Sequence, residues 1–405
     1  MVISFNTFLT EETDESGSGK KLKHLKHIED MHIHDGHEGV GNAAKMLDDA
    51  HKSLLGKKTD TNISTKYDGA PSLVFGYHPK HGRFFVASKS AFNKNPKINY
   101  TNQDIEDNHG HAPGLVSKLK DALQHLPKII PKQGVYQGDV MHSGKNDVTS
   151  DKGQFHFQPN TVKYSIDRDT HHGQTIRHAK FGVVIHTKYK GKQLEDMEAT
   201  PHVDHENFSQ HPDVHNINPS VKFDSSLYTS EKQRDYLNHI ENAKKTYSKM
   251  KPDVFDPIKG HETDLEAHIN DMVRKDGVPS HEGYMDHISN KHNKEIEKLK
   301  TEAGKDKKRQ ALSKKLEHIQ SNKQSFNKAL ELHQHLQKAK NVLTDVMSQN
   351  TDFEHSIAGQ KTGPEGFVAH NKGNMAKFVN RSEFSKMNLL GYGAIAAGKK
   401  QDEKV

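Results

Sequence analysis

Residues 63–76 read ISTKYDGAPSLVFG and place Lys66 at the end of an apolar, strand-like run. A carboxylate, Asp68, follows two residues later, and Gly69 comes directly after it. Because side chains alternate with a period of two along a strand, we expect Lys66 and Asp68 on one face of the sheet. The glycine lets the backbone turn or approach a ligand closely. A lysine amine is a good nucleophile only when deprotonated, and a pocket of cations and metal holds it in that state. The segment therefore predicts a strand that ends at a reactive lysine.

Four further segments follow this stretch along the chain. They are VYQGDVM at 135–141, KFGVVIHTKY at 180–189, EGFVAH at 365–370 and NMAKFVNRSEF at 374–384. Taken in order with KYDG, they resemble the motifs of the covalent nucleotidyltransferases, which include ATP-dependent RNA and DNA ligases and mRNA-capping guanylyltransferases. KYDG matches the K-x-D-G motif, Glu365 to Val368 match E-G-x-V, and Lys377 matches half of the final K-x-K. The resemblance covers residues 57–205 and 351–385, about half of the chain.

The resemblance implies a role for each matched position. The residues it places at the nucleotide site are Thr65, Lys66, Asp68, Gly69, Lys89, Asp139, Phe181, Glu365 and Lys377. Lys66 is expected to attack the α-phosphorus of ATP, and Lys377 to neutralise charge on the phosphorus oxygens. Carboxylates are the hard ligands that Mg²⁺ or Mn²⁺ takes, so Asp139 and Glu365 are expected to hold the metal. Phe181 is expected to stack on the purine, with an ordinary core position as the alternative.

Two departures from the family pattern bear on the activity. Val379 stands where many relatives carry the second lysine of K-x-K, so one phosphate contact comes from elsewhere or is missing. Pro71 stands where DNA ligases and capping enzymes keep an arginine, which some RNA ligases also lack, so this favours an RNA ligase. The segment FFVASKSAF at 84–92 resembles the S-K-x-G element of several RNA ligases and offers Lys89 as a second cation. The alternative for Lys89 is an exposed strand lysine.

The composition excludes several kinds of protein. The chain has 405 residues, 31% of them hydrophobic, and it contains no Cys and no Trp. Without Cys there are no disulfides, no thiol catalysis and no thiolate zinc sites. No run of about 18 apolar residues is present, and the N-terminus lacks the basic start and apolar stretch of a secretion signal. We therefore expect an intracellular protein, cytoplasmic, with no membrane partner.

Histidine is unusually frequent, with 32 residues scattered along the chain. The segment HIHDGHEG invites a metal site at His32, His34 and His37. In a chain so rich in histidine, a solvated loop is the favoured interpretation of this segment.

The order of strand-like and helical segments predicts an α+β fold. The resemblance implies a nucleotidyltransferase core of antiparallel sheets with helices, and the charged helical segments are expected to form a long insert in it. The expected parts are a flexible N-terminal lead at 1–20, N-terminal helices at 21–56, the core at 57–225 and 351–385, the insert at 226–350 and a C-terminal tail at 386–405. The lead is rich in Gly and Ser. The tail is too short for the OB-fold domain of DNA ligases and capping enzymes, so we expect no such domain.

The insert is charged and helical in spacing. Between residues 291 and 340 it carries 14 Lys or Arg against 6 Asp or Glu. A narrow apolar stripe, typical of a coiled-coil seam, comprises Leu312, Leu316, Ile319, Phe326, Leu330 and Leu336. The pattern fits a helical hairpin that packs on itself and binds nucleic acid with its basic face. It equally fits an insert that completes the core, and the sequence leaves both open.

These observations lead to a functional hypothesis. We expect an ATP-dependent polynucleotide ligase, with RNA favoured over DNA, that acts through a covalent lysyl-AMP intermediate, uses Mg²⁺ or Mn²⁺, and joins a 5′-phosphate to a 3′-hydroxyl. The chain is also similar to proteins of tailed bacteriophages, which places it in the host cytoplasm with a repair role. The alternatives are nucleotidyl transfer to another acceptor, such as a protein or a cap, and a degenerate, non-catalytic nucleic-acid-binding protein. The oligomeric state stays open.

Overall fold

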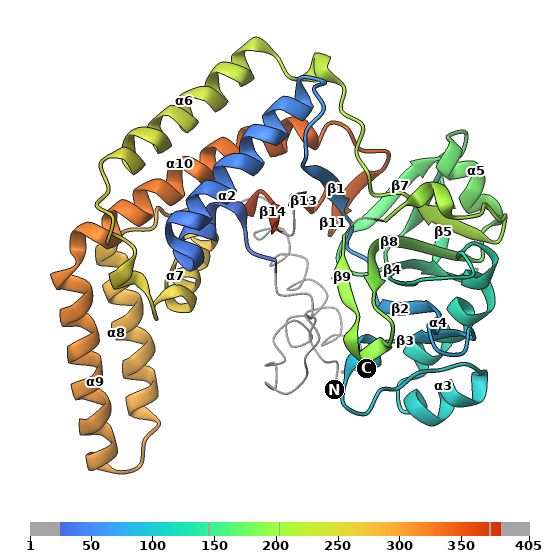
Figure 1. Ribbon diagram of the computed structural model, residues 1–405, viewed down its shortest axis with the longest axis horizontal. Helices are drawn as coiled ribbons and strands as arrows, with labels where there is room; N and C mark the ends of the chain where they lie inside the picture. The colour runs from blue at the N-terminus through green and yellow to red at the C-terminus, as the bar shows by residue number, and fades with distance from the viewer. Residues whose placement is uncertain (1–24, 145, 202, 372–373, 382–405) are drawn as a thin grey trace.

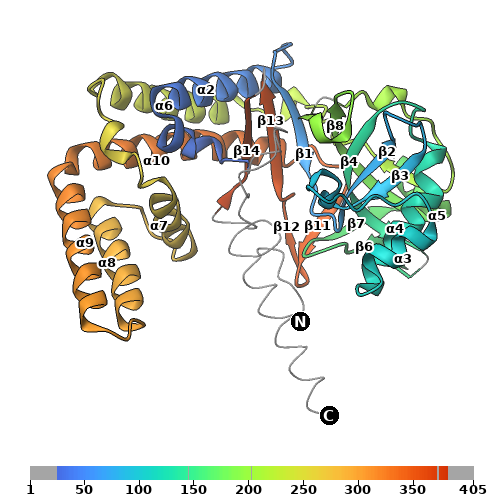
Figure 2. The ribbon, with the colours of Figure 1, turned by 60° about the horizontal axis from the view of Figure 1, so that its bottom comes forward.

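The computed structural model describes residues 25–144, 146–201, 203–371 and 374–381. Figures 1 and 2 show a β-rich body and a helical body that meet along one small sheet. The expected lead at 1–20 and tail at 386–405 lie outside the described residues, as does the end of the last motif after residue 381.

The largest sheet has six strands in the order β10-β8-β4-β2-β3, with β9 paired to β8. Its strands are β2 (Ser72–Tyr77), β3 (Phe84–Ala87), β4 (Val135–Ser143), β8 (Phe181–Lys190), β9 (Glu198–Thr200) and β10 (Val214–Ile217). All pairs are antiparallel except β10 with β8. The apolar residues of the central strands β2, β4 and β8 are buried because both faces of this sheet are covered.

Helices cover one face of this sheet. They are α3 (Asn102–His109) and α4 (Pro113–His125), whereas α5 (His171–His178) packs beside β10 on the opposite face, where Ile176 joins the core of Met141 and Val184. The start of α3 is fixed by a capping box between Thr101 and Asp104. Proline at the first position of α4 suits a helix start, since its missing N–H would have no partner there. The apolar face of α4, with Val116, Leu119 and Ala122, packs on the sheet.

The other face packs against a second, five-stranded sheet in the order β12-β11-β7-β6-β5. Its strands are β5 (Val148–Asp151), β6 (Gln154–Phe157), β7 (Lys163–Asp167), β11 (Glu354–Ile357) and β12 (Gln360–Thr362). A third sheet joins β1 (Asn62–Lys66), β13 (Gly366–Asn371) and β14 (Asn374–Phe378), all antiparallel. This sheet places the strand of the K-x-D-G segment next to the strands that carry the E-G-x-V segment and Lys377.

The helical body contains α2 (Met31–Leu54), α6 (Ser230–Ser248), α7 (Glu262–Arg274), α8 (His281–Glu297), α9 (Glu302–Ser321) and α10 (Lys323–Met347). Short 3-10 turns join several elements: η1 (Ile28–Asp30), η2 (Lys89–Phe92), η3 (Leu126–Lys128), η4 (Leu194–Asp196), η5 (His205–Asn207), η6 (Ser225–Leu227) and η7 (Asp256–Ile258). The hairpin of α8 and α9 extends away from the rest (Figure 1).

One apolar core is shared by the helical body and the small sheet. It combines residues of α2, α6 and α10 with Ile63 of β1, Phe367 and Ala369 of β13, and Ala376 and Phe378 of β14. The insert therefore completes the core that supports the motif-bearing strands, while nucleic-acid binding by its basic hairpin stays a prediction. The α8–α9 hairpin stands apart from the sheets (Figure 2).

One local expectation holds and another is corrected. The N-terminal helices expected at 21–56 are two helical stretches of α2 that meet at a kink at Gly36 (φ 55°, ψ −131°), with no separate loop between them. The apolar stripe from Leu312 to Leu336 is not one seam, since the helix breaks at Asn322 between α9 and α10.

The fold is thus α+β, with antiparallel sheets and many helices. Within the described part of the chain, no helix is both long enough and apolar enough to cross a membrane.

Candidate active site

The register of the small sheet places the two motif lysines on one face. Ser64 of β1 pairs with Val368 of β13, and Val368 pairs with Lys377 of β14. Directly paired residues project to the same side of a sheet, and Lys66 lies two residues beyond Ser64. Lys66 and Lys377 therefore project from the same face, although they are far apart in the sequence.

Glu365, directly before β13, forms an ion pair with the Nζ atom of Lys66. Both side chains are largely enclosed, with 28% of Lys66 and 14% of Glu365 exposed. Burial alone would lower the pKa of Lys66, but the carboxylates of Glu365 and Asp68 outweigh it and raise the pKa. Burial also raises the pKa of Glu365, against the opposing effect of Lys66. The expected nucleophile, Lys66, and an expected metal ligand, Glu365, are thus in contact.

Lys377 has different surroundings. Burial, together with the positive charge of Lys66, lowers the pKa of Lys377 to about 8, and the nearby Glu365 only partly opposes this. The backbone N–H of Lys377 donates to the carbonyl of Lys26, at 2.8 Å. The protonation state of Lys377 therefore changes with a small shift in pH or with the binding of an anion.

Asp139 lies in the middle of β4, where it pairs with Ser72 of β2 and Val184 of β8. Its Oδ2 atom is 3.5 Å from Nε2 of His186. Burial would raise the pKa of Asp139, but His186 and a hydrogen bond from Ser72 lower it, and the charge of Lys66 adds to this. Asp139 is therefore held as a carboxylate at the edge of the site, as expected for a nucleotide or metal ligand.

Gly69 is required by a close approach of two chain segments. A Cβ atom built on Gly69 would lie 2.6 Å from Cβ of Asp139 and 3.0 Å from Sδ of Met141. The next residue, Ala70, donates its N–H to the carbonyl of Val140, at 2.9 Å. Gly69 therefore carries the loop after Lys66 against β4 and brings Lys66 and Asp139 to one site.

Asp68 has a different role from the one expected. The strand β1 ends at Lys66, so Asp68 lies beyond it rather than on its face. The Asp68 carboxylate accepts hydrogen bonds from the Asn160 side chain at 2.9 Å and from the backbone N–H groups of Thr161 and Val162 at 2.9 and 3.2 Å. Its acceptor sites are thus taken up by the loop before β7. Asp68 fixes that loop and remains close enough to influence the charge of Lys66.

Two other expected residues point away from the site. Phe181 is fully buried in the core between the large sheet and α4, together with Val183 and Ile185. Val184 pairs with Asp139, so Phe181, Val183 and Ile185, which alternate with it, project to the opposite face. Phe181 is a core residue and does not stack on a ligand. Thr65 is 9% exposed and alternates with Lys66, so its side chain also faces the opposite way.

Lys89 does not lie in a strand, since β3 ends at Ala87 and Lys89 begins the 3-10 turn η2. Its side chain is exposed. Val74 pairs with Ala87, and two residues earlier Ser72 pairs with Asp139. Lys89 therefore lies at the same end of the large sheet as Asp139, at the rim of the site.

His186 was not singled out by the motifs. It is the unpaired residue of a bulge in β8, since Ile185 pairs with Gly138 and Thr187 pairs with Gln137. Its Nδ1 atom is 2.9 Å from Oγ1 of Thr187. Counting alternate residues along the strand could not have found it, because the bulge shifts the alternation at this position.

The chemistry of the donors fits a divalent cation. The Oε2 atom of Glu365 is buried and has no hydrogen-bond partner, which leaves a carboxylate oxygen free for a metal. Asp139 is held ionised nearby. No group of three or more His, Asp or Glu side chains in the described part of the chain is arranged as a preformed metal site. Phosphate oxygens and water would have to complete the coordination shell, as is usual for Mg²⁺.

A cavity reaches Glu365 from the side of α10. It has a volume of about 180 Å³ and is lined by Thr344, Asp345, Ser348, Thr362, Gly363, Pro364, Glu365 and Asn380. A neighbouring cavity of about 300 Å³ shares Ser348 and residues 362–364 and continues between β7 and β11. No motif indicated these cavities, because their walls come from segments that pack only in the folded chain.

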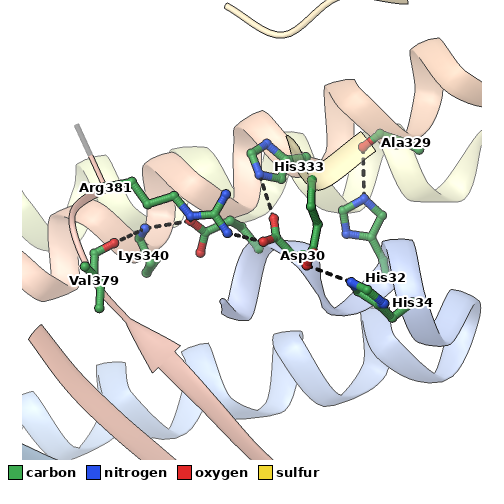
Figure 3. Close-up of polar contacts among 10 residues, drawn as sticks. Asp30, His32, His34, Ala329, His333, Lys340, Val379 and Arg381 are labelled. Atoms are coloured by element: carbon green, nitrogen blue, oxygen red, sulfur yellow. Dashed lines mark hydrogen bonds and ion pairs between the residues drawn. The ribbon is translucent and has the colours of Figure 1, made fainter. Parts of the chain in front are cut away.

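Behind β14 lies a buried cluster of charged residues (Figure 3). Lys340 of α10 donates from Nζ to Glu29 at 2.8 Å and to the backbone oxygen of Val379 at 2.5 Å. Arg381 forms an ion pair with Asp30, and His333 lies 3.1 Å from Asp30. All these side chains are at most 2% exposed.

The cluster fastens the end of the Lys377 strand to α10. Val379, at the position of the missing lysine, is itself a core residue at 5% exposure.

The histidine-rich segment forms neither a metal site nor a solvated loop. His32 is fully buried with Nε2 3.0 Å from the oxygen of Ala329, and His34 contacts Glu266 of α7 at 2.7 Å. The Nδ1 atom of His37 lies 2.8 Å from the Tyr247 hydroxyl. The three rings join α2 to three different elements of the helical body.

Comparisons with known proteins place the chain in a family without giving an activity. No curated protein and no solved structure matches it. A family model described as a family of unknown function (DUF6267) matches residues 22–391. This range covers both bodies and every element of the candidate site, so the chain belongs to the DUF6267 family.

Proposed function

We propose that the protein is an ATP-dependent nucleotidyltransferase that forms a covalent lysyl-AMP intermediate on Lys66 and transfers AMP to a polynucleotide end. The observation that carries the proposal is the contact of Lys66 with Glu365, which joins the K-x-D-G and E-G-x-V segments from opposite ends of the chain. Lys377 on the same sheet face and Asp139 beside Gly69 complete a set that the motif resemblance predicts. Motif matches that arose by chance would have no reason to lie together in the folded chain.

The proposed reaction has three steps. Nζ of Lys66 forms a bond to the α-phosphorus of ATP while the bond to pyrophosphate breaks. The AMP then passes from Lys66 to a 5′-phosphate, which forms a 5′-5′ pyrophosphate and releases the lysine. Finally a 3′-hydroxyl attacks that 5′-phosphate and AMP leaves. Attack by Lys66 requires the neutral amine, and the Glu365 oxygen in contact with Nζ is the nearest acceptor for the ammonium proton.

The charges around the site set a condition on the first step. In the described state the carboxylates raise the pKa of Lys66, so the amine is held as a cation until its surroundings change. A divalent cation held by Asp139 and Glu365 would neutralise these carboxylates and the phosphates. Lys377, with a pKa near 8, is the described cation best placed to stabilise the charge on the triphosphate oxygens.

A radiolabelling experiment tests the proposal. Purified protein is incubated with ATP labelled at the α-phosphorus and Mg²⁺, and the protein band is examined for label. We expect an adduct that acid destroys and alkali spares, as for a phosphoramidate, and no adduct when the γ-phosphorus carries the label. GTP labelled at the α-phosphorus identifies a capping-type preference. Absence of any adduct would overturn the proposal.

The acceptor is proposed to be RNA before DNA, because the arginine that Pro71 replaces is also missing in some RNA ligases. Transfer to a protein acceptor is the second outcome that the labelling experiment can reveal, as label on an added protein. A cytoplasmic location, in the host cell of a bacteriophage, fits this role. The buried Val379 favours one rival, a non-catalytic nucleic-acid-binding protein, since it supplies no second cation.

A further inference from the structure

The outer part of the α8–α9 hairpin concentrates positive charge. Residues 291–315 carry ten Lys or Arg against four Asp or Glu, an excess of six positive charges on two helices. Like charges held so close together destabilise the folded hairpin by mutual repulsion. Such an arrangement calls for a reason beyond packing.

Ion pairs account for half of these cations. Lys291 and Lys315 both contact Asp264 of α7, Lys308 contacts Glu295, and Lys305 and Arg309 contact Glu302. The remaining five are exposed and have no carboxylate partner among the described residues. They are Lys294, Lys298, Lys300, Lys307 and Lys314. We call these five the open lysines.

The open lysines face outward. On α9, Leu312 and Ile319 are buried in the core, whereas Lys307 and Lys314 lie on the opposite side of the helix at 100° per residue. Seven residues apart, these two lysines stand about 10.5 Å from each other along the helix. Lys298 and Lys300 flank the turn between the helices. The paired cations contact carboxylates of α7, α8 and α9. Of the open lysines, Lys294, Lys298, Lys300 and Lys307 lie within two turns of the outer end, and Lys314 continues the row along α9.

The character of this surface identifies its partner. Protein–protein interfaces rely on apolar and aromatic anchors. Among the described residues, the exposed large hydrophobic side chains are Leu237 and Val278, and neither lies in the hairpin. A surface with unpaired lysines and no apolar anchor matches a polyanion instead. We propose that the outer end of the α8–α9 hairpin binds the sugar–phosphate backbone of a single-stranded nucleic acid. The inference extends the proposed function by locating where the polynucleotide is held.

The test compares two variants of the full-length chain. In one, the five open lysines are replaced by Gln; in the other, five exposed lysines elsewhere are replaced, namely Lys57, Lys58, Lys80, Lys94 and Lys192. Both lose the same charge. Binding of a fluorescent 20-nucleotide RNA, and of the same DNA strand, is followed by anisotropy between 50 and 300 mM salt. Thermal unfolding confirms that both variants remain folded.

We expect the open-lysine variant to bind at least tenfold more weakly than the control, equally for RNA and DNA, since backbone contacts carry no sequence or sugar information. Its plot of log affinity against log salt should be shallower by about 3.5, at roughly 0.7 per lost contact. Equal affinities and slopes for the two variants would overturn the inference. Adduct formation with ATP is measured in parallel on all proteins. A wild-type protein that forms no adduct refutes the proposed function. An open-lysine variant that forms the adduct but binds RNA weakly supports the role of the hairpin in holding the polynucleotide.

Discussion

Nζ of Lys340 lies 2.8 Å from Oε1 of Glu29, and neither side chain has any exposed surface. The pair links the segment before α2 with α10, the last helix of the insert, and Lys340 also binds the backbone after the Lys377 strand. Burying two charges is costly unless they are paired in good geometry with further hydrogen bonds. The helical insert is therefore part of the structure that holds Lys377 in place.

Replacing Lys340 by Met should strongly destabilise the protein. The change leaves the buried carboxylate of Glu29 with only the longer contact to Nε of Arg381 at 3.5 Å, and removing one partner of a buried pair typically costs about 3–5 kcal/mol. The free energy of unfolding in urea measures it. Lys338→Met is the matched control, because Lys338 is on the same helix but exposed, and it should change stability little. A double variant with Glu29→Gln should recover part of the loss; no recovery would show that the pair does not act as a unit.

Replacing Lys66 by Ala should abolish the nucleotide adduct. Lys66→Arg is the informative companion, since arginine keeps the positive charge beside Glu365 but its guanidinium stays protonated and is a poor nucleophile. Both variants should lack the adduct, while Lys57→Ala, an exposed lysine near the same strand, should form it normally. The measurement is label from α-labelled ATP on the protein. Adduct on the Arg variant would remove Lys66 as the nucleophile.

Binding of ATP should weaken as the pH rises through about 8. The pKa of Lys377 is lowered to about 8 in the folded protein, so its charge is present below that pH and lost above it. A neutral amine no longer attracts the triphosphate. Calorimetric titration with ATP between pH 6.5 and 9 measures the effect. Lys377→Arg remains charged throughout and should flatten this dependence; a fall of the same size in the Arg variant would assign the titration to another group.

The same lowered pKa predicts the direction of a stability change. The unfolded lysine has an ordinary pKa near 10.5, so between about pH 8 and 10.5 the unfolded chain binds more protons than the folded one. This contribution to stability therefore rises with pH across that window. Comparing wild type with Lys377→Met by urea unfolding at pH 7.5 and 10 isolates it. The free energy of unfolding of wild type, relative to that of Lys377→Met, should be larger at pH 10 than at pH 7.5.

Replacing Gly69 by Ala should disrupt the site. The new Cβ atom would lie 2.6 Å from Cβ of Asp139, so the loop after Lys66 or the strand β4 must move. Overpacking of this kind typically costs about 1–3 kcal/mol, and displacement of Lys66 from Asp139 should reduce adduct formation further. Gly114→Ala is the control, since no atom lies within 4 Å of its added Cβ. A Gly69→Ala protein that labels as well as wild type would show that this approach is not needed.

The sequence predicts the site well where a motif is local and poorly where the fold decides. The strands at KYDG, EGFVAH and MAKFVN carry a clear alternation, so Lys66 and Lys377 could be placed without a structure. Phe181 was misplaced because an apolar strand buried on both faces hides its phase. The short polar strands β5 and β12 were missed because they lack an apolar period. No sequence pattern pairs Lys340 with Glu29, since these residues are 311 positions apart and meet only when the chain folds.

Deleting residues 229–348 and bridging the ends with Gly and Ser should give an insoluble or molten protein. The deletion removes α6 and α10, which share one apolar core with β1, β13 and β14, and it leaves Glu29, Asp30 and Arg381 without Lys340. A second deletion, of residues 291–315 alone, removes only the outer hairpin and should leave a folded protein, because this end lies apart from the sheets. Dye binding to exposed apolar surface and near-ultraviolet circular dichroism distinguish a molten from a native state. The short deletion should still form the lysyl adduct and should lose RNA affinity, whereas the long one should do neither. A soluble, cooperatively folded long-deletion protein that still forms the adduct would show that the β-rich body folds without the insert and that the shared core is not required for the chemistry of Lys66.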